Sequence, residues 1–366
     1  MRDASPHVHG ADGRRLRIAV LQGRADPATL ATAAVTYQAA QFLHLEEFAD
    51  VVWDDQAFAL LAAGGAAPPV DAVVAFDERS LLTDPRIEAI PDDLDRLFVL
   101  ITHDFWAHPV KVAEAMSARR RPLMILRHLS AIRLFELLAP GVPKLLQRPG
   151  VETSIFRPHD GPKEWDVLLS GSETPDYPHR RRFNRIVREY AAEYGWRLLD
   201  LTAIGLVSQP RSGQHEYVPS LAAAKVSPTA TNHGGAPCAR LVVQYVDVGE
   251  VRGRLDDEFY GLELPDVVVN EIPTAGITPR YLESLATRTL LMGDLPACDA
   301  QEWYRDKMVV IPDDASDREV AELIDRWVRA DEERGQLCAR AYDAVVAGET
   351  SRHRAAELAE IIAAHA

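Results

Sequence analysis

Cysteine is scarce in this chain of 366 residues. The three cysteines are odd in number and far apart, at Cys238, Cys298 and Cys338. A disulfide framework needs paired cysteines, and a zinc site needs ligands only a few residues apart, so both are excluded. We therefore expect a protein of the reducing cytoplasm.

Positive charge is also in short supply. The chain has 40 Lys and Arg residues against 55 Asp and Glu residues, which gives a formal net charge of −15. A protein that binds nucleic acid needs a basic face to meet the phosphates. No nucleic-acid partner is expected.

A long hydrophobic run is missing too. The most apolar region, residues 58–76, is interrupted by two glycines, two prolines and Asp71, so it cannot form a spanning helix. Residues 1–15 lack the apolar centre of a signal peptide and are predicted to be a flexible tail. The sequence predicts a cytoplasmic protein without a membrane span.

Several catalytic motifs are absent. The chain contains no Gly-x-Ser-x-Gly, Walker loop, His-Glu-x-x-His or Cys-x-x-Cys, which removes the commonest hydrolase, kinase and metalloenzyme interpretations. No Gly-x-Gly-x-x-Gly follows the first apolar run, so a tightly bound dinucleotide is disfavoured. Neither a metal nor a cofactor is expected.

What the chain does contain is a repeated alternation of short apolar runs and helical segments. The segments between the runs are long enough for crossovers, which predicts an α/β protein with mainly parallel sheets covered by helices on both faces. A length of 366 residues favours two such domains. Strands are predicted at 17–23, 51–53, 72–76, 97–101, 123–126, 143–147, 166–169, 196–199, 267–269, 290–292 and 308–311, and helices at 31–48, 180–194, 217–224 and 318–328.

One short helix carries the clearest chemical signal. Thr278 is predicted to cap a helix that begins at Pro279, where proline loses only an N–H that a helix leaves unpaired. Arg280 and Glu283 share a face within the first two turns, beside the loop that contains Gly276. Such a helix start favours an anion, and a carboxylate there can accept hydrogen bonds from ribose hydroxyls. An ordinary ion pair on a solvated helix fits the local sequence equally well.

The pattern Gly276-x-x-Pro279-Arg280-x-x-Glu283-x-x-Ala286 before an apolar strand resembles the donor-site helix of GT-B glycosyltransferases, in the family-four-like and CgeB-like groups. The resemblance implies a GT-B architecture, with two Rossmann-like domains facing each other across a cleft, and a glutamate that holds the nucleotide ribose. Family-four enzymes usually carry another glutamate eight residues earlier, where this chain has Ala275. The CgeB-like group is therefore the closer match.

The domain boundaries follow from a break in the alternation and from the same resemblance. Residues 149–158 begin with Pro-Gly and end in proline, and they resemble the interdomain linker of GT-B enzymes. We expect an acceptor domain at 16–150, a donor domain at 151–348, and a C-terminal helix at 349–366 that crosses back to the first domain. The apolar face of that helix would otherwise dock on its own domain or on a second copy of the chain.

In the donor domain, polar residues at the carboxyl ends of predicted strands are the binding candidates. Gly171 and Ser172 follow a strand and can present amides to phosphate, although a plain turn is an equal alternative. Arg180 and Arg182 can supply positive charge, and the segment that begins at Tyr217 is where base contacts are expected. The full set of donor-binding candidates is Gly171, Ser172, Arg180, Arg182, Tyr217, Gly276, Arg280 and Glu283.

Three residues in the first domain are catalytic candidates. His103 and Asp104 follow a strand and resemble the His-Asp-Trp turn of family-four-like enzymes, whose histidine reaches the donor sugar. His128 follows the next strand in the same manner. Ordinary hydrogen-bonded packing is the alternative for each histidine.

The resemblance implies a hexosyltransferase-like enzyme that moves a sugar from a UDP-, GDP- or dTDP-sugar to a small-molecule or polymer acceptor. Metal-independent, retaining transfer is expected. An epimerase or hydrolase of the same fold, and a non-catalytic homologue that binds a nucleotide sugar, remain open. The base, the sugar, the acceptor and the oligomeric state are not encoded in a recognisable motif.

Overall fold

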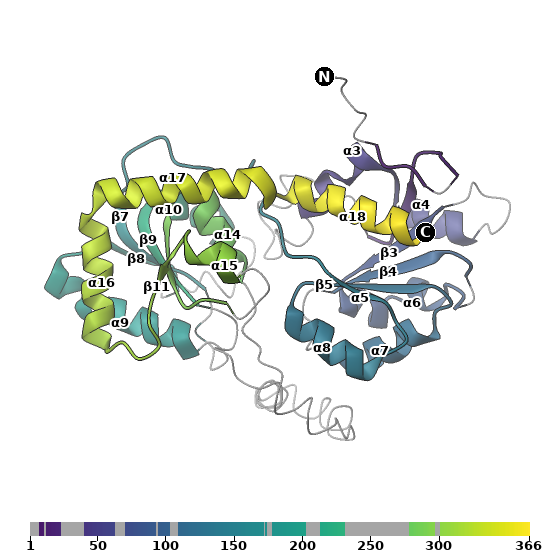
Figure 1. Cartoon of the computed structure of the whole chain (residues 1–366), viewed down its shortest axis with the longest axis horizontal. Helices are drawn as coiled ribbons and strands as arrows, with labels where there is room; N and C mark the ends of the chain where they lie inside the picture. The colour runs from purple at the N-terminus through teal and green to yellow at the C-terminus, as the bar shows by residue number, and fades with distance from the viewer. Residues whose placement is uncertain are drawn as a thin grey trace. The chain divides into compact units, whose positions relative to one another are not determined.

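The computed structural model describes residues 7–10, 12–22, 40–62, 70–92, 94–102, 109–171, 173, 178–202, 213–230, 278–296 and 301–366. These residues fall into two compact units (Figure 1). The first unit includes the described residues up to Gly150 and those from Ser351 to Ala366. Val151–Thr350 belongs to the second unit. The predicted strand at 267–269 lies outside the described residues.

The first unit is built on a parallel sheet of six strands. Runs of β-branched and other apolar residues form its central strands, and β3 (Ala72–Phe76) and β4 (Leu97–Ile101) are buried along their whole length, as expected for a sheet covered on both faces. In spatial order the strands are β2 (Asp50–Trp53), β1 (Arg17–Val20), β3 (Ala72–Phe76), β4 (Leu97–Ile101), β5 (Pro122–Leu126) and β6 (Lys144–Leu146).

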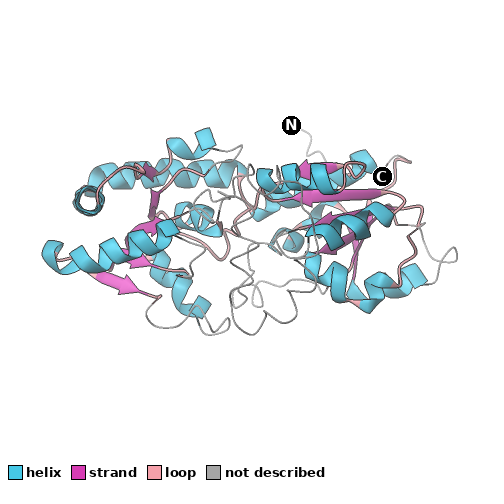
Figure 2. Ribbon diagram, turned by 90° about the horizontal axis from the view of Figure 1, so that it is seen from below, coloured by secondary structure: helices cyan, strands magenta, loops and turns pink. Residues whose placement is uncertain are grey.

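Short helices connect these strands. Figure 2 shows helices layered against the strands of this unit. The described helices are η1 (Ala40–Leu43), α3 (Leu45–Phe48), α4 (Asp54–Ala62), α5 (Glu78–Thr83), α6 (Pro85–Glu88), α7 (Pro109–Ala118), α8 (Leu129–Leu138) and α18 (Ser351–His365).

Helix α18 contributes to the core of the first unit although it closes the chain. Ala355, Leu358 and Ile362 are fully buried in the same cluster as Ile18 and Val74 of the sheet. The helix contacts η1 and α3, beside which Figure 1 draws it. An apolar stripe at helical spacing gains hydrophobic stabilisation only when another surface covers it, and this sheet covers it.

Residues 1–15 were predicted to be a flexible tail, and that prediction is wrong for part of the stretch. The N–H of Val8 donates to the carbonyl of Phe48, and the N–H of Leu16 donates to the carbonyl of Val8, both at 2.9 Å. His9 and Arg15 form an antiparallel bridge. Backbone hydrogen bonds to a neighbouring helix fix a polar segment that has no apolar periodicity of its own.

The second unit has a parallel sheet of five strands. Alternate residues of β7 (Trp165–Leu169) face opposite layers. Val167 and Leu169 pack with α9 (Pro178–Tyr194) and α16 (Asp317–Arg329), whereas Leu168 packs with α14 (Pro279–Ala286) and α17 (Asp331–Gly348). In spatial order the strands are β11 (Val309–Val310), β10 (Leu290–Gly293), β9 (Ala224–Thr229), β7 (Trp165–Leu169) and β8 (Leu198–Asp200).

The helices of this unit cover both faces of the sheet. They are α9 (Pro178–Tyr194), α10 (Gly213–Ala222), α14 (Pro279–Ala286), α15 (Gln301–Arg305), α16 (Asp317–Arg329) and α17 (Asp331–Gly348). Two helix-covered parallel sheets confirm the predicted α/β class with two Rossmann-like domains.

Strand β9 was missed from the sequence, because it contains Pro228 and proline is normally excluded from central strands. The structure shows how the proline is accommodated. The ladder between β9 and β7 ends at the Val226–Val167 pair, two residues before Pro228. On the other side, Pro228 continues in register with Met292 of β10. A proline beyond the end of one ladder removes no N–H that this ladder uses.

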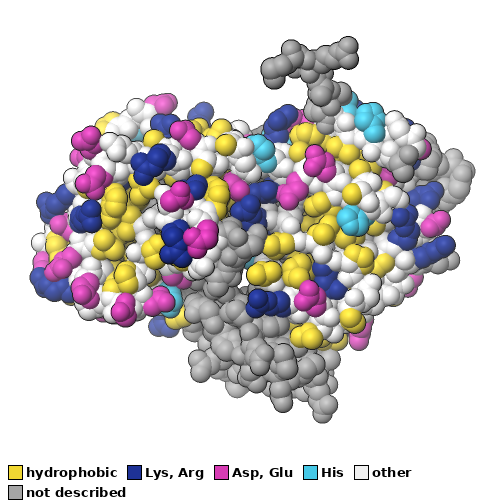
Figure 3. All heavy atoms as spheres, in the orientation of Figure 1, with side chains coloured by type: hydrophobic (Ala, Val, Ile, Leu, Met, Phe, Trp, Pro, Cys, Tyr) yellow, Lys and Arg dark blue, Asp and Glu magenta, His cyan; other side chains and the backbone are white. Residues whose placement is uncertain are grey.

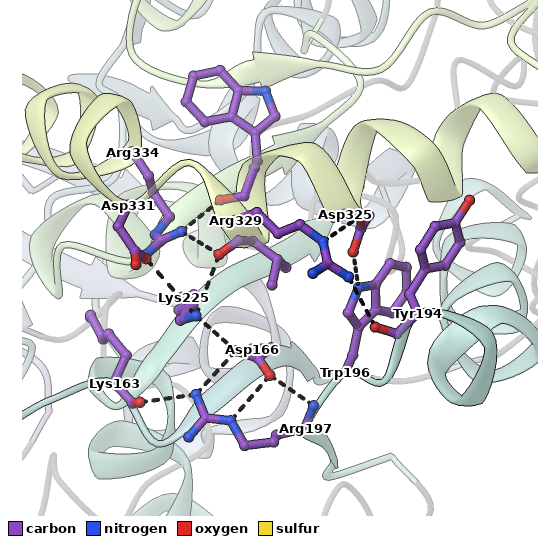
Figure 4. A network of polar contacts seen from close by, with 12 residues as sticks. Lys163, Asp166, Tyr194, Trp196, Arg197, Lys225, Asp325, Arg329, Asp331 and Arg334 are labelled. Atoms are coloured by element: carbon purple, nitrogen blue, oxygen red, sulfur yellow. Dashed lines mark hydrogen bonds and ion pairs between the residues drawn. The ribbon is translucent and has the colours of Figure 1, made fainter.

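A network of charged side chains joins the amino ends of β7, β8 and β9 (Figure 4). Asp166 accepts hydrogen bonds from the Nη2 of Arg197 at 3.0 Å and pairs with the Nζ of Lys225 at 2.9 Å. Burial by itself raises the pKa of Asp166, but the hydrogen bonds from Arg197 and Lys225 outweigh burial and hold the pKa well below its usual range. Asp331 and Arg334 of α17 extend the network.

The visible surface of the second unit carries acidic and basic side chains interspersed with one another (Figure 3). The excess of negative charge is therefore not collected in one patch on this face. None of the described helices is both long and apolar enough to cross a membrane.

Candidate functional site

Helix α14 begins where the sequence predicts, with Pro279 at its first position and Thr278 as the N-cap in extended conformation. The predicted capping bond does not form. The Thr278 hydroxyl is buried and has no hydrogen-bond partner among the described residues. All residues from Tyr281 to Ala286 are buried. The alternative of a solvated helix with an ordinary ion pair is therefore excluded.

Glu283 is the most unusual of these buried residues, because only 7% of it is exposed. The hydroxyl of Tyr217, on α10, donates a hydrogen bond of 2.7 Å to its Oε2 atom. Burial raises the pKa of Glu283, while the charge of Arg280 and the Tyr217 hydrogen bond act in the opposite direction. Among the described residues, Oε1 has no hydrogen-bond partner. The carboxylate is therefore held on one side and available on the other.

Arg280 lies between Glu283 and the end of β7. Its Nε donates to the hydroxyl of Ser170 at 3.1 Å. Its guanidinium carbon lies 5.6 Å from the centre of the Tyr217 ring, a distance at which a cation is attracted to the ring face. These contacts orient the guanidinium toward the loop that follows β7.

Gly171, the first residue after Ser170, is where two guanidinium groups converge. Its φ of +97° lies in the region that favours glycine. A Cβ at this position would lie 2.6 Å from Nη1 of Arg280 and 3.0 Å from Nη1 of Arg180. The positive φ favours glycine here, and a Cβ would force the ends of the two arginine side chains to shift. Two guanidinium groups at the carboxyl end of a parallel strand form a favourable environment for phosphate oxygens.

Arg182 lies elsewhere, although the sequence grouped it with Arg180. Its Nε contacts Oδ1 of Asp317 at 3.0 Å, and its Nη2 donates to the carbonyl of Ala315. Two residues along a helix correspond to a rotation of about 200°. Arg180 shares the buried face of α9 with Phe183, three residues later, whereas Arg182 points away toward α16. That spacing is a sequence signal that distinguishes the two arginines.

Sequence reasoning missed a second polar cluster at the same edge of the sheet. His179, in the first turn of α9, has its Nδ1 3.4 Å from Oδ2 of Asp294, which follows β10. The hydrogen bond to Asp294 raises the pKa of His179, against a smaller effect of burial. The hydroxyl of Tyr281 donates to the backbone carbonyl of Asp294 at 2.6 Å. Only the position of Asp294 directly after an apolar strand hinted at this cluster.

The catalytic candidates belong to the first unit. His103 and Asp104 lie outside the described residues, as do the donor-binding candidates Ser172 and Gly276. His128 is described: it is the N-cap of α8, its side chain makes no capping hydrogen bond, and it is half-buried at the carboxyl end of β5. Its role stays a prediction.

Within the described residues, no group of three or more His, Cys, Asp and Glu side chains is arranged to hold a metal ion. Cys338 is buried with a free thiol, and burial raises its pKa to about 11.

Solved structures with a similar architecture include two that cover almost the whole chain. Alr3699/HepE of Anabaena, in complex with UDP and glucose, superposes with a TM-score of 0.52 at 12% identity, over 95% of this chain and 100% of that chain. The trehalose-6-phosphate synthase OtsA superposes with a TM-score of 0.52 at 11% identity, over 95% of this chain and 98% of that chain. At this identity the similarity shows the fold, which is GT-B.

A family model supplies the enzyme class. Residues 260–360 match the family described as glycosyl transferase-like, a region that includes Arg280 and Glu283. The chain is a glycosyltransferase of the GT-B fold. No curated protein sequence matches it. The family-four-like and CgeB-like grouping of this GT-B enzyme stays a prediction.

Proposed function

We propose that this GT-B enzyme transfers a hexose from a nucleoside diphosphate sugar to an acceptor hydroxyl, and that its second unit binds the donor. The observation that carries the proposal is the buried Glu283 carboxylate, which Tyr217 holds through one oxygen. Burial deprives a carboxylate of its hydrogen bonds to water. Hydrogen bonds donated by the ribose hydroxyls would replace them. Arg280 acts on the Glu283 charge, and Arg280 and Arg180 both approach Gly171, where we expect the diphosphate to extend.

Known complexes of the fold support this assignment. Alr3699/HepE has also been solved with UDP-glucose, and that structure superposes on the present chain with a TM-score of 0.50 at 11% identity. The donor class proposed here, a UDP-, GDP- or dTDP-sugar, includes that compound. The base and the sugar are to be found by a binding panel.

Metal-independent transfer is part of the proposal. Guanidinium groups can neutralise the negative charge that develops on a departing diphosphate, which is the task that a divalent cation performs in other enzymes. Arg280 and Arg180, whose guanidinium groups both approach Gly171, are the residues proposed for it. Full turnover in the presence of a strong chelator is the expected result, and activity that returns only with added metal contradicts this part.

Retention of configuration is proposed as well. A retaining enzyme uses the donor's own phosphate oxygen to help deprotonate the acceptor, so no protein base is essential; inversion requires a base, for which His103 and His128 are the candidates. Proton NMR of the anomeric signal in the product distinguishes the two outcomes. His103→Ala is expected to weaken donor positioning under retention and to abolish most turnover under inversion.

Transfer and hydrolysis assays with UDP-, GDP- and dTDP-sugars test the function directly. Turnover of one donor, with calorimetric binding of the matching nucleoside diphosphate, is the expected result. Binding without turnover on any acceptor of a broad hydroxyl panel would instead identify a non-catalytic nucleotide-sugar-binding protein.

A cytoplasmic location, which the low cysteine content favours, is included in the proposal.

A further inference from the structure

We propose that Tyr217 is a positioning residue for donor binding: its hydroxyl orients the Glu283 carboxylate toward the nucleotide ribose and favours the ionised form of that carboxylate. The inference rests on the proposed function, because it gives Glu283 the ribose. It assigns Tyr217 a different task from the base contact predicted from the sequence.

The Tyr217 ring is held in place on two sides. The ring of Phe156 packs edge-on against it, with a centroid distance of 6.4 Å and an interplanar angle of 69°. Arg280 approaches it on another side, at 5.6 Å from the centroid. With the ring fixed, the hydroxyl position is fixed too, and it lies 2.7 Å from Oε2 of Glu283. Such a short bond to a carboxylate is expected when the acceptor carries the charge.

The proton of this hydrogen bond belongs to Tyr217. Burial and the neighbouring Glu283 charge raise the pKa of Tyr217 well above its usual value, so the phenol stays protonated and can only donate to the carboxylate. The single proton of this hydroxyl is therefore used by Glu283.

Removal of the hydroxyl leaves Glu283 with less support. The titratable and charged groups that act on it, among the described residues, are Arg280 from its own helix and Tyr217 from α10. Arg280 is itself bonded to Ser170 and shared with the Gly171 loop. Without Tyr217, the buried carboxylate is free to turn toward Arg280 or to take up a proton. Either change removes an acceptor from the ribose.

The test uses Tyr217→Phe, which removes one oxygen and keeps the ring packing. Calorimetry with UDP, GDP, ADP and dTDP first finds the nucleotide that the wild-type chain binds, and that nucleotide is then titrated from pH 5 to pH 8.5. The variant is expected to bind about tenfold more weakly at pH 7, the size of one hydrogen bond to a charged group. The midpoint of its affinity against pH should also move to higher pH, which a purely structural role of Tyr217 would not cause.

A double-mutant cycle separates this inference from the proposed function. In the Glu283→Gln background, Tyr217→Phe is expected to cost less than twofold, because the group that it positions is gone. Tyr342→Phe serves as the matched control and should bind as the wild type does, because Tyr342 lies on α17 with its ring against Arg288.

Three outcomes overturn the inference. Wild-type affinity of Tyr217→Phe at every pH contradicts it directly. Equal and additive losses in both backgrounds show that Tyr217 contacts the nucleotide itself, which leaves the ribose role of Glu283 intact. If Glu283→Gln binds the nucleotide as tightly as the wild type does, or if the wild-type chain binds none of the four nucleotides, both the proposed function and this inference are contradicted.

Discussion

A Cβ atom on Gly171 would lie 2.6 Å from Nη1 of Arg280, closer than a real Cβ approaches any heavy atom. The two residues are more than a hundred positions apart in the sequence, and they meet because β7 and α14 place their ends at the same edge of the second sheet. The absence of a side chain at Gly171 therefore leaves room for the Arg280 guanidinium beside the loop.

Gly171→Ala is expected to lower nucleotide affinity at least tenfold, because the new methyl group displaces Arg280 from the loop. A residue other than glycine at positive φ also costs about 1–2 kcal/mol of stability. Gly195→Ala is the matched control, since Gly195 has a φ of +69° and its Cβ would meet nothing within 4 Å. Calorimetric titration and thermal unfolding of both variants should show similar destabilisation but a binding loss only at Gly171. Equal nucleotide affinities of Gly171→Ala and Gly195→Ala would show that the loop at Gly171 is not part of the phosphate site.

Arg280→Lys should weaken binding of a nucleoside diphosphate by about 1.5–3 kcal/mol, because lysine cannot reproduce the planar, bidentate contact. The loss should be smaller for the corresponding monophosphate. Arg182→Lys is the control. Because Arg182 contacts Asp317, this substitution is expected to leave the nucleotide affinity unchanged. A larger effect at Arg182 than at Arg280 would reverse the assignment of the phosphate contacts.

The pH dependence of binding should report on Glu283. Its pKa is raised by burial, and ribose hydroxyls hydrogen-bond best to the ionised carboxylate. Nucleotide affinity of the wild-type chain should therefore rise with pH through that pKa and level off above it. Glu283→Gln should be weaker by about 1.5–3 kcal/mol at pH 8 and lack this rise, apart from the ionisation of the ligand that both proteins share. Parallel pH profiles in the two proteins would contradict the role of Glu283.

The same group should affect folding in the opposite sense. Because the pKa of Glu283 is higher in the folded state than in the unfolded chain, the folded state binds more protons, and stability falls as pH rises above the ordinary value of 4.5 through the folded pKa. Urea unfolding of Glu283→Gln without nucleotide should lack this fall. A steeper decline in the variant would be inconsistent with a raised pKa.

Asp166→Asn is expected to destabilise the second unit by roughly 1–3 kcal/mol near pH 7, since Arg197 and Lys225 lose their charged partner. The pKa of Asp166 is depressed, so its contribution is complete above the ordinary pKa of 3.8 and is lost as pH falls through the folded value. The variant should therefore lose less stability than the wild type does on acidification. Asp331→Asn, whose carboxylate is 74% exposed, should have a smaller effect, and neither change should alter nucleotide affinity.

Leu358→Ala in α18 should destabilise the first unit by about 2–5 kcal/mol, because the side chain is fully buried in the core of that unit. Nucleotide binding, which we assign to the second unit, should persist at temperatures where the first unit of the variant has unfolded. Differential scanning calorimetry with and without nucleotide measures both. Glu360→Ala, on the exposed face of the same helix, is the control.

The short helix that carries Glu283 could be predicted from the sequence because its signals are local. The proline at the start of α14 and the apolar residues at helical spacing fixed the position of Glu283 on a short helix. What the sequence left open was whether that helix was solvated. Burial of every residue from Tyr281 to Ala286 depends on β10 and α17, which pack against the helix from elsewhere in the chain.

By itself, the sequence determined the α/β class and the positions of most strands along the chain, since apolar periodicity acts within a few residues. Tertiary structure alone decided which polar groups meet. Tyr217 reaches Glu283 over 66 positions, and Arg280 reaches Ser170 over 110. Strand β9 accepts Pro228 because its ladder with β7 has already ended. Such contacts follow from the packing of whole elements, and no local pattern of residues specifies them.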